Sequence, residues 1–284
     1  MKSRFPARAG DAVPPGTASG FAKRWKVVRS MAFFAAAVGW LFVVGLGLRL
    51  SVWPLVTLRP SLRPRVLGGY LRFQGRFYLR LARALAGVRF TVHGRMDPGP
   101  CVVVMNHQSV FDIPLLLAIT PGPYPKIPTR DRYRRGIPGV SPMLRACRYP
   151  VITQRRDTIR SDLAVIAGAA DEVARGESAM AIFPEGHRTR DGEIGPFMVR
   201  GLRTILEHAP DVPVWIIVAD GMWGARTFAE VAVQLAGARI DARVLGPFAA
   251  PRSPEGLDAF IADLRERMVA TLAQMRSGIP PRAA

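Results

Sequence analysis

A histidine and an aspartate stand five residues apart in the segment Asn106–Asp112, which reads NHQSVFD. The segment follows an apolar run, Cys101–Met105, that is typical of a buried strand. A histidine at a strand end can act as a general base because its pKa lies near neutrality, and Asp112 can accept the imidazole N–H and stabilise the imidazolium. This contact needs a loop, since residues i and i+5 do not face each other on a regular helix. The spacing by itself is also that of a strand-end histidine before a helix-capping aspartate.

Ser109 lies in the same segment and raises the alternative of a serine hydrolase with a Ser-His-Asp arrangement. The G-x-S-x-G elbow that exposes the nucleophile of the α/β hydrolases is absent around Ser109. We therefore expect Ser109 to cap the helix that follows, a position at which serine is strongly favoured.

A second polar segment, Phe183–Arg188, reads FPEGHR and also follows an apolar run with the character of a strand. The Glu185 carboxylate is suited to hold hydroxyl groups, and the Arg188 guanidinium can grip a phosphate through two parallel hydrogen bonds. Gly186 lets a backbone N–H approach a substrate closely, so we expect an oxyanion-stabilising donor near it. A plain strand and turn with a solvent-exposed ion pair is the alternative interpretation.

Taken together, N-H-x-x-x-x-D and, about 80 residues later, F-P-E-G-x-R resemble the glycerolipid acyltransferase family, and within it the bacterial 1-acylglycerol-3-phosphate acyltransferases. The resemblance covers roughly residues 70–250. It implies that His107 and Asp112 form the catalytic dyad. It also implies a set of substrate-binding residues: Asn106, Lys126, Arg155, Glu185, Gly186 and Arg188.

The activity implied by this resemblance is transfer of a fatty acyl group to the sn-2 hydroxyl of 1-acylglycerol-3-phosphate, giving phosphatidate. The acyl thioester, acyl-CoA or acyl carrier protein, is a co-substrate, and no metal or other cofactor is expected. The family usually has Thr, Lys and Pro where this chain has His187, Met198 and Ile216, and the first two lie in or beside the acceptor-binding block. Another lyso- or hydroxy-lipid, such as an acylated amino acid, is therefore an alternative acceptor.

Strands and helices alternate from Val88 onward, which is typical of an α/β domain. The expected strands are Val88–His93, Cys101–Met105, Tyr149–Thr153, Ala179–Phe183, Val212–Ala219 and Ile240–Leu245. The expected helices are Tyr70–Ala86, Phe111–Ala118, Ser161–Arg175, Gly201–His208 and Pro254–Met275. We expect a single acyltransferase domain over residues 61–284, with a mixed sheet flanked by helices, an amphipathic C-terminal helix and a membrane-associated helical segment before it.

Residues 1–30 form a basic leader rich in Pro, Gly and Ala, which we expect to be mobile. The following segment, residues 31–60, opens with an unbroken apolar or glycine run, Met31–Leu48, whose helix length of about 27 Å is marginal for a hydrocarbon core of about 30 Å. Basic residues on both sides leave the orientation of a single span undecided. We expect a membrane-associated hairpin, with a single span as the alternative, that places the catalytic domain on the cytoplasmic side of the inner membrane.

The hydrophobic fraction of 49% excludes a disordered, collagenous or low-complexity chain. The formal net charge is +19. Such a basic protein favours phosphates, an anionic membrane surface or an acidic partner such as acyl carrier protein. A non-catalytic, basic, membrane-anchored nucleic-acid binder is the alternative from another class, but it gives His107 no role, and we expect no nucleic-acid partner. The only cysteines are Cys101 and Cys147, and no Cys/His cluster has zinc spacing, so neither a disulfide framework nor a structural metal is expected.

Overall fold

Six strands form one mixed sheet in the order β1-β8-β7-β2-β6-β3 in the computed structural model, which describes residues 20–278. These strands are β1 Arg89–His93, β2 Val102–Met105, β3 Pro125–Lys126, β6 Ala179–Ile182, β7 Val214–Asp220 and β8 Arg239–Phe248. Neighbouring strands run parallel except β7 and β8, which are antiparallel. Two short strands, β4 Thr129–Arg130 and β5 Val151–Ile152, pair in parallel as a separate sheet. The expected mixed sheet is confirmed.

The central strands β2, β6 and β7 are apolar along almost their whole length because both faces of the sheet are covered. Successive side chains of a strand point to opposite faces, so Val103 and Met105 of β2 pack into one core while Val102 and Val104 pack into the other. The continuous apolar runs in the sequence thus correspond to buried strands between two layers of helices.

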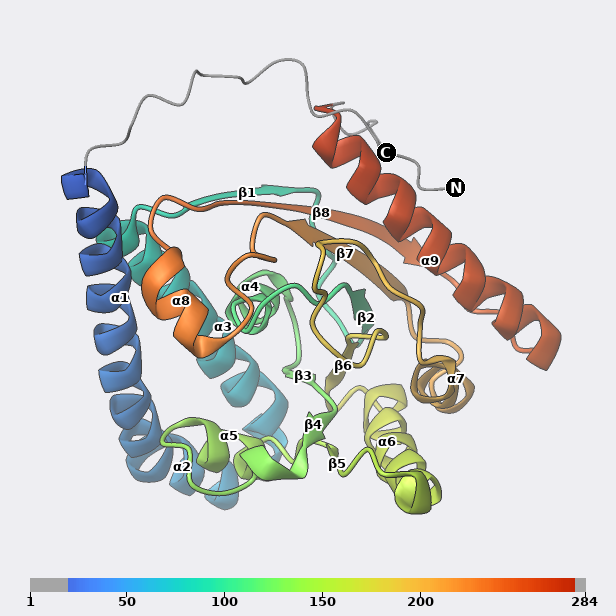
Figure 1. Ribbon diagram of the computed structural model, residues 1–284. Coiled ribbons are helices and arrows are strands. Elements are labelled where there is room, and N and C mark those ends of the chain that lie inside the picture. Colours follow the sequence, from blue (N-terminus) through green and yellow to red (C-terminus); the bar gives the residue numbers. More distant parts are fainter. Residues whose placement is uncertain (1–19, 279–284) are drawn as a thin grey trace.

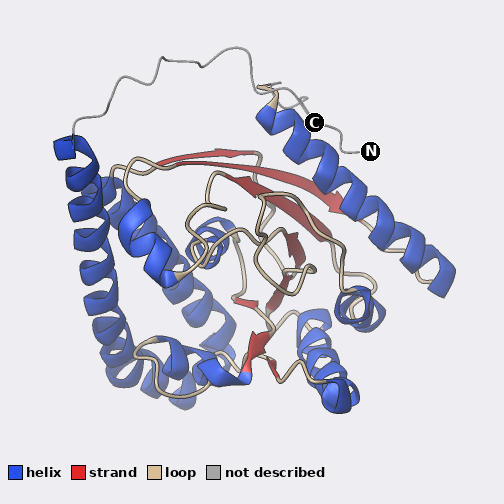
Figure 2. Cartoon of the chain, in the orientation of Figure 1, coloured by secondary structure: helices blue, strands red, loops and turns tan. Residues whose placement is uncertain are grey.

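Helices cover each face of the sheet, as Figures 1 and 2 show. The first face packs against α1 Gly20–Gly47, α3 Arg63–Leu81, α4 Asp112–Ile119, α5 Val140–Ala146 and α8 Phe228–Gln234. The second face packs against α6 Ile159–Ala174, α7 Val199–His208 and α9 Pro254–Arg276. The arrangement is the expected α/β domain flanked by helices.

The N-terminal helix α1 begins at Gly20, so the last part of the expected mobile leader, residues 20–30, is helical. This part of α1 is tied to the domain because Ser30 is fully buried and its hydroxyl accepts a hydrogen bond from the Ala236 amide at 2.9 Å. Phe33, one turn further on, is also buried in the first core. Residues 1–19 of the expected leader lie outside the described residues.

Residues 31–60 lie within a helical hairpin that extends beyond them on both sides. α1 continues through a π-helical turn, Leu48–Val52, into α2 Trp53–Leu58. The chain then reverses, and α3 runs back beside α1 (Figure 1). The Trp40 ring stacks on Phe77 with a centroid separation of 3.9 Å, and Trp40 Nε1 donates to Gln74 Oε1 at 2.7 Å. The return arm of this hairpin is therefore the basic helix α3, which packs against α4.

Candidate active site

The two polar segments found in the sequence meet at the carboxyl ends of two neighbouring parallel strands. β2 pairs with β6, with Val104 opposite Ile182, so the segments that leave these strands emerge side by side. His107 follows β2, and Glu185 follows β6. This edge is where open α/β sheets place reactive groups, and the topology alone brings the histidine and the F-P-E-G-x-R segment together.

The expected contact between His107 and Asp112 is present, with Nδ1 of the imidazole 2.8 Å from Oδ2 of the carboxylate. Residues 106–111 form the required loop, and α4 begins at Asp112. The same Oδ2 accepts the backbone amides of Gln108 at 2.7 Å and Ser109 at 2.8 Å. The carboxylate is thereby fixed as an acceptor, which places the proton of the neutral imidazole on Nδ1 and the lone pair on Nε2. His107 is arranged as a general base.

An aromatic ring holds the other side of the imidazole. Phe183 stacks on His107 with a centroid separation of 4.2 Å and an interplanar angle of 23°. Stacking and the Asp112 contact together restrict the ring to one orientation, and the π face of Phe183 also favours the imidazolium that a general base becomes. The sequence placed Phe183 in the second segment but gave no sign of this contact.

Glu185 is buried, with 2% of its surface exposed, and both of its carboxylate oxygens accept backbone amides. Oε1 accepts the His107 amide at 2.9 Å, and Oε2 accepts the Gly195 amide at 3.1 Å. Burial raises the pKa of Glu185, although the two amide hydrogen bonds act in the opposite direction. The carboxylate therefore crosslinks the two catalytic segments behind the histidine and does not line the cavity in front of it.

Asn106 has a similar role on the opposite side. Its amide nitrogen donates to the Ala219 carbonyl at 2.9 Å, and its side-chain oxygen accepts the Ala219 amide at 2.8 Å. This pair of bonds attaches the start of the catalytic loop to β7, and Asn106 is 2% exposed. Like Glu185, it positions the loop and does not line the cavity.

A cavity of about 1310 Å³ opens at His107. Much of its wall is apolar, with Phe33 and Val44 from α1, Leu117 from α4 and Met143 from α5 among the lining residues. Arginines also line it, namely Arg130, Arg132, Arg155, Arg156, Arg188, Arg190, Arg200 and Arg226. The cavity thus combines a surface suited to a hydrocarbon chain with cations suited to phosphate.

Comparison with known proteins agrees with this geometry. Residues 89–217 match the family model described as Acyltransferase, a range that contains both Asn106–Asp112 and Phe183–Arg188. The crystal structure of the 1-acyl-sn-glycerophosphate (LPA) acyltransferase PlsC from Thermotoga maritima has a similar fold, with a TM-score of 0.60 and 19% identity over 88% of this chain and 98% of that one.

These matches support the expected resemblance to the glycerolipid acyltransferases, and the family match covers just under half of the chain. Human 1-acyl-sn-glycerol-3-phosphate acyltransferase beta is 28% identical over 142 residues. These residues make up 49% of this chain and 50% of the human protein, so the chain spans about half the length of this curated relative.

Three further predicted site residues lie on the cavity. Arg188 donates from Nη1 to the Arg226 carbonyl at 2.5 Å, which aims its guanidinium along the wall. Arg155 is exposed and pairs with Asp157 at 3.0 Å. Gly186 has a φ of +70°, and its amide donates to the Phe183 carbonyl at 3.0 Å, so that amide already has an acceptor within the loop.

Lys126 is placed apart from the cavity. Its side chain is fully buried, and Nζ lies 2.5 Å from Oε2 of Glu172 on α6. Burial lowers the pKa of Lys126, while the hydrogen bond and charge of Glu172 oppose that change. In this conformation Lys126 joins β3 to α6 and is not among the cavity-lining residues.

Ser109 is not arranged as a nucleophile. The residue is fully buried, its hydroxyl donates to the Ala225 carbonyl, and the same oxygen accepts the Phe111 amide at 3.2 Å. The expectation that Ser109 caps the following helix is wrong, because the N-cap residue of α4 is Phe111 and no side chain caps this helix. The Ser109 contacts instead stabilise the turn before α4. Ser109 does not line the cavity.

Arg226 is a cavity residue that the sequence analysis missed. It precedes Thr227, which starts α8 with a capping box: the Thr227 hydroxyl accepts the Glu230 amide at 3.2 Å, and Glu230 accepts the Thr227 amide at 2.8 Å. The T-x-x-E pattern is readable in the sequence and predicts a helix start there. That its neighbour Arg226 faces the same cavity as Arg188 depends on tertiary structure.

Proposed function

We propose that this protein is a membrane-bound O-acyltransferase that moves a fatty acyl group from an acyl thioester to the sn-2 hydroxyl of 1-acylglycerol-3-phosphate, giving phosphatidate. The observation that carries the proposal is the His107–Asp112 dyad opening onto a cavity that has both an apolar wall and arginines. The two relatives described above act, by their names, on 1-acyl-sn-glycerol-3-phosphate, which supports the same acceptor here.

In the proposed reaction, Nε2 of His107 takes the proton of the acceptor hydroxyl as the hydroxyl oxygen attacks the thioester carbonyl carbon. The tetrahedral intermediate collapses with cleavage of the carbon–sulfur bond, and the imidazolium gives its proton to the leaving thiolate. The Asp112 carboxylate stabilises the imidazolium between these steps. The reaction needs acyl-CoA or acyl carrier protein as a co-substrate and no metal or other cofactor.

The arginines that line the cavity support a phosphate-bearing acceptor, because a guanidinium binds phosphate in a planar, forked geometry. Two of the three departures from the family pattern, His187 and Met198, also line the cavity. The third, Ile216, is fully buried in the second core of the sheet and cannot touch an acceptor. The headgroup preference therefore depends on His187 and Met198.

Membrane association is part of the proposal. The segment Gly20–Leu58 is helical, long and apolar enough to cross a membrane, and 22% of its most apolar stretch is buried inside the protein. Large apolar side chains remain exposed along it, including Phe42 at 61%, Leu46 at 58% and Leu50 at 68%. An exposed apolar helix beside the cavity gives a lipid acceptor a direct route from the bilayer. We place the domain on the cytoplasmic side of the inner membrane, where acyl-CoA and acyl carrier protein are present.

The acceptor is tested by offering lysophosphatidate, glycerol 3-phosphate and a phosphate-free lysolipid side by side to the purified protein, with acyl-CoA or acylated carrier protein as donor. We expect lysophosphatidate to have the highest kcat/KM. Arg188→Ala should lower that value by about 30- to 150-fold, the equivalent of about 2–3 kcal/mol for a charge-assisted contact, and should affect the phosphate-free acceptor much less.

The matched control is Arg175→Ala. This change removes an exposed arginine at the C-terminal end of α6 that pairs with Glu177 and does not line the cavity. It should leave all three acceptors unchanged. If the phosphate-free acceptor is preferred, and Arg188→Ala lowers all three rates equally, the lysophosphatidate assignment fails while acyl transfer stands.

Membrane binding is tested with Phe42→Asn and Leu46→Asn, which leave the buried residues of α1 in place. Sedimentation with anionic vesicles should fall, and activity on a bilayer acceptor should fall more than activity on a short soluble acceptor. Val165→Asn, at an exposed apolar position on α6, is the control and should bind vesicles normally. Unchanged sedimentation of both α1 variants contradicts the membrane assignment.

A further inference from the structure

Gln108, the residue after the catalytic histidine, faces away from the cavity and is 1% exposed. Its backbone amide donates to Asp112, the aspartate of the dyad, at 2.7 Å. Its side chain reaches the end of β7, where Oε1 accepts the Met222 amide at 3.1 Å and Nε2 donates to Oδ1 of Asp220 at 3.1 Å. Gln108 therefore joins the dyad to Asp220.

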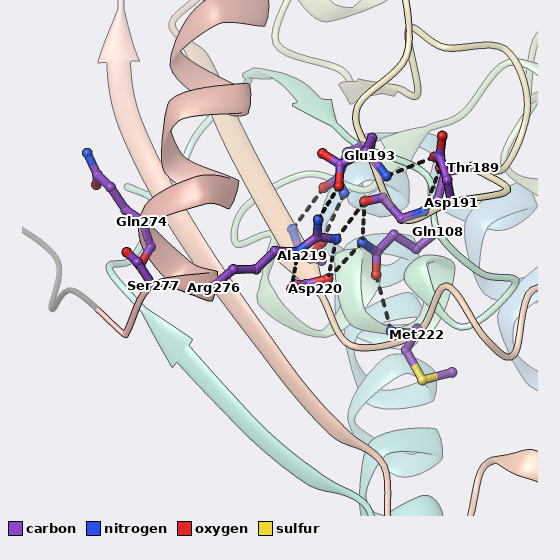
Figure 3. A network of polar contacts seen from close by, with 12 residues as sticks. Gln108, Thr189, Asp191, Glu193, Ala219, Asp220, Met222, Gln274, Arg276 and Ser277 are labelled. Carbon is purple, nitrogen blue, oxygen red and sulfur yellow. Dashed lines mark hydrogen bonds and ion pairs between the residues drawn. The ribbon is translucent and has the colours of Figure 1, made fainter. Parts of the chain in front are cut away.

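Asp220 is in turn held by Arg276, which comes from the last turn of α9 near the other end of the chain (Figure 3). Arg276 Nε donates to Oδ2 of Asp220 at 2.9 Å, and Nη2 donates to Oδ1 at 3.1 Å. The pair is largely shielded, with the Arg276 side chain 29% and the Asp220 side chain 19% exposed. Two parallel contacts of this kind fix direction as well as position.

The same guanidinium also holds the loop that follows Phe183–Arg188. Arg276 Nη2 donates to the Gly192 carbonyl at 2.8 Å, and Nη1 lies 2.5 Å from Oε1 of Glu193. Gly192 has a φ of +88°, and a Cβ there would lie 2.9 Å from Arg276 Nη2 and 3.0 Å from the Trp223 ring. Any other residue at this position would force the Arg276 or Trp223 side chain to move, so glycine is the residue that fits beside the arginine.

This loop returns to the catalytic histidine. The Thr189 amide donates to the His107 carbonyl at 2.8 Å, and the Thr189 hydroxyl accepts the Gly192 amide at 3.1 Å. Arg276 is therefore connected to the His107 segment by two routes, one through Asp220 and Gln108 and one through Gly192 and Thr189.

We propose that Arg276 and Asp220 are positioning residues for acyl transfer, and that they hold the His107–Asp112 loop in register from the C-terminal end of α9. The assignment rests on the proposed function, since it concerns the geometry of that reaction. Neither residue lines the cavity, so neither touches a substrate there. They act through Gln108 and through the Gly192 loop.

Loss of Arg276 removes both hydrogen bonds to the Asp220 carboxylate and leaves its charge without this countercharge. The carboxylate can then turn toward solvent, which withdraws the acceptor from Gln108. Because a small displacement of a catalytic group is enough to slow a reaction, we expect kcat of Arg276→Gln to fall by about 10- to 100-fold. The KM values for acceptor and thioester should stay within about twofold, because the cavity wall is unchanged.

The test compares Arg276→Gln, Arg276→Lys and Asp220→Asn with Arg267→Gln in the full-length protein. Arg267 lies on the same helix and pairs with Asp263 one turn away, so its loss removes an equal charge and one ion pair without touching the catalytic loop. Arg276→Lys keeps the positive charge but loses the forked guanidinium that makes two parallel hydrogen bonds. Its kcat should lie between those of Arg276→Gln and the wild-type protein. Arg267→Gln should have normal kcat.

A second readout needs no substrate. Amide hydrogen exchange, followed by mass spectrometry of the peptide that contains Gln108 and Ser109, reports how firmly the loop is held. Exchange should be faster in Arg276→Gln and Asp220→Asn and unchanged in Arg267→Gln.

Normal kcat together with normal exchange in Arg276→Gln overturns the proposal, as does a loss expressed only in KM. If the wild-type protein transfers no acyl group to any acceptor, the proposed function fails. In that case the exchange comparison still decides whether α9 holds the loop.

Discussion

Glu185→Gln separates two roles for the glutamate of the F-P-E-G-x-R segment. The resemblance to the family implies that Glu185 binds the acceptor, whereas its oxygens accept the amides of His107 and Gly195. Glutamine keeps the size and shape of the side chain but replaces one acceptor oxygen with an amino group. That group must face one of the two backbone N–H donors, so one hydrogen bond is lost and two donors are opposed.

The magnitude follows from these contacts. A hydrogen bond to a charged group contributes about 1.5–3 kcal/mol to stability. Part of this loss is offset, because burial raises the pKa of Glu185 and ionisation of the buried carboxyl is itself unfavourable. We expect the free energy of unfolding to fall by about 1–2 kcal/mol. We also expect kcat to fall by about 10-fold, because the His107 amide is no longer held, with the acceptor KM within about twofold.

The assay measures initial rates of thiol release against lysophosphatidate concentration, together with denaturant unfolding of the same preparation. Glu177→Gln is the control, because it removes an exposed glutamate that pairs with Arg175. An acceptor KM that rises at least 10-fold in Glu185→Gln, with kcat and stability unchanged, would refute the positioning role and restore the acceptor-binding one.

The remaining predictions concern the groups around the dyad. Asp112→Asn should lower kcat by about 10- to 150-fold, because the charge that stabilises the His107 imidazolium is lost. The protein should remain folded, because the asparagine side-chain oxygen can keep the contacts that Oδ2 of Asp112 makes. An unchanged kcat would exclude the dyad mechanism. Phe183→Leu should lower kcat about 2- to 10-fold through loss of ring stacking worth about 0.5–1.5 kcal/mol, measured at saturating substrate. Burial opposes ionisation of Asp220, but hydrogen bonds from Arg276 and Gln108 outweigh it and hold its pKa below the usual aspartate value. This interaction stabilises the fold above the unfolded-state pKa of Asp220, and the stabilisation is lost as the pH falls through the folded-state pKa. In Arg276→Gln, the free energy of unfolding should therefore decline less steeply on acidification below about pH 4. Urea titrations at a series of pH values measure this decline.

The core of the fold and the dyad were predictable because their signals are local. Continuous apolar runs such as Cys101–Met105 indicate strands covered on both faces, and a polar residue directly after such a run lies at the sheet edge. The spacing of His107 and Asp112 then needs only a loop for the two side chains to meet. Parallel pairing of β2 with β6 brings the second segment to the same edge.

The start of α1 was not predicted because the basic residues before Met31 look like a solvated leader. The helix extends back to Gly20 because tertiary contacts support it. Arg29 donates from Nε to the Leu85 carbonyl at 2.9 Å, near the end of the helical segment before Gly87, and Ser30 is buried. A basic side chain that caps another helix cannot be told from a solvated one by sequence alone.

The roles of the charged site residues were harder to predict than their presence. Glu185 and Lys126 have the chemistry of substrate-binding groups, but their partners are backbone amides and Glu172, which are distant in sequence. The contact between Gln108 and Asp220 spans 112 residues and leaves no local pattern. Residue type and spacing indicate which groups can do chemistry, while the three-dimensional arrangement decides which of them face the cavity.

The most direct test of the account measures acyl transfer by the purified wild-type protein and by His107→Ala in lipid vesicles. The substrates are a fatty acyl-CoA and lysophosphatidate, with free thiol and phosphatidate quantified in the same reaction. We expect equal amounts of thiol and phosphatidate from the wild-type protein, and loss of both from a folded, vesicle-bound His107→Ala. Near-normal phosphatidate formation by His107→Ala, or thiol release by the wild-type protein without any acylated lipid, would contradict it.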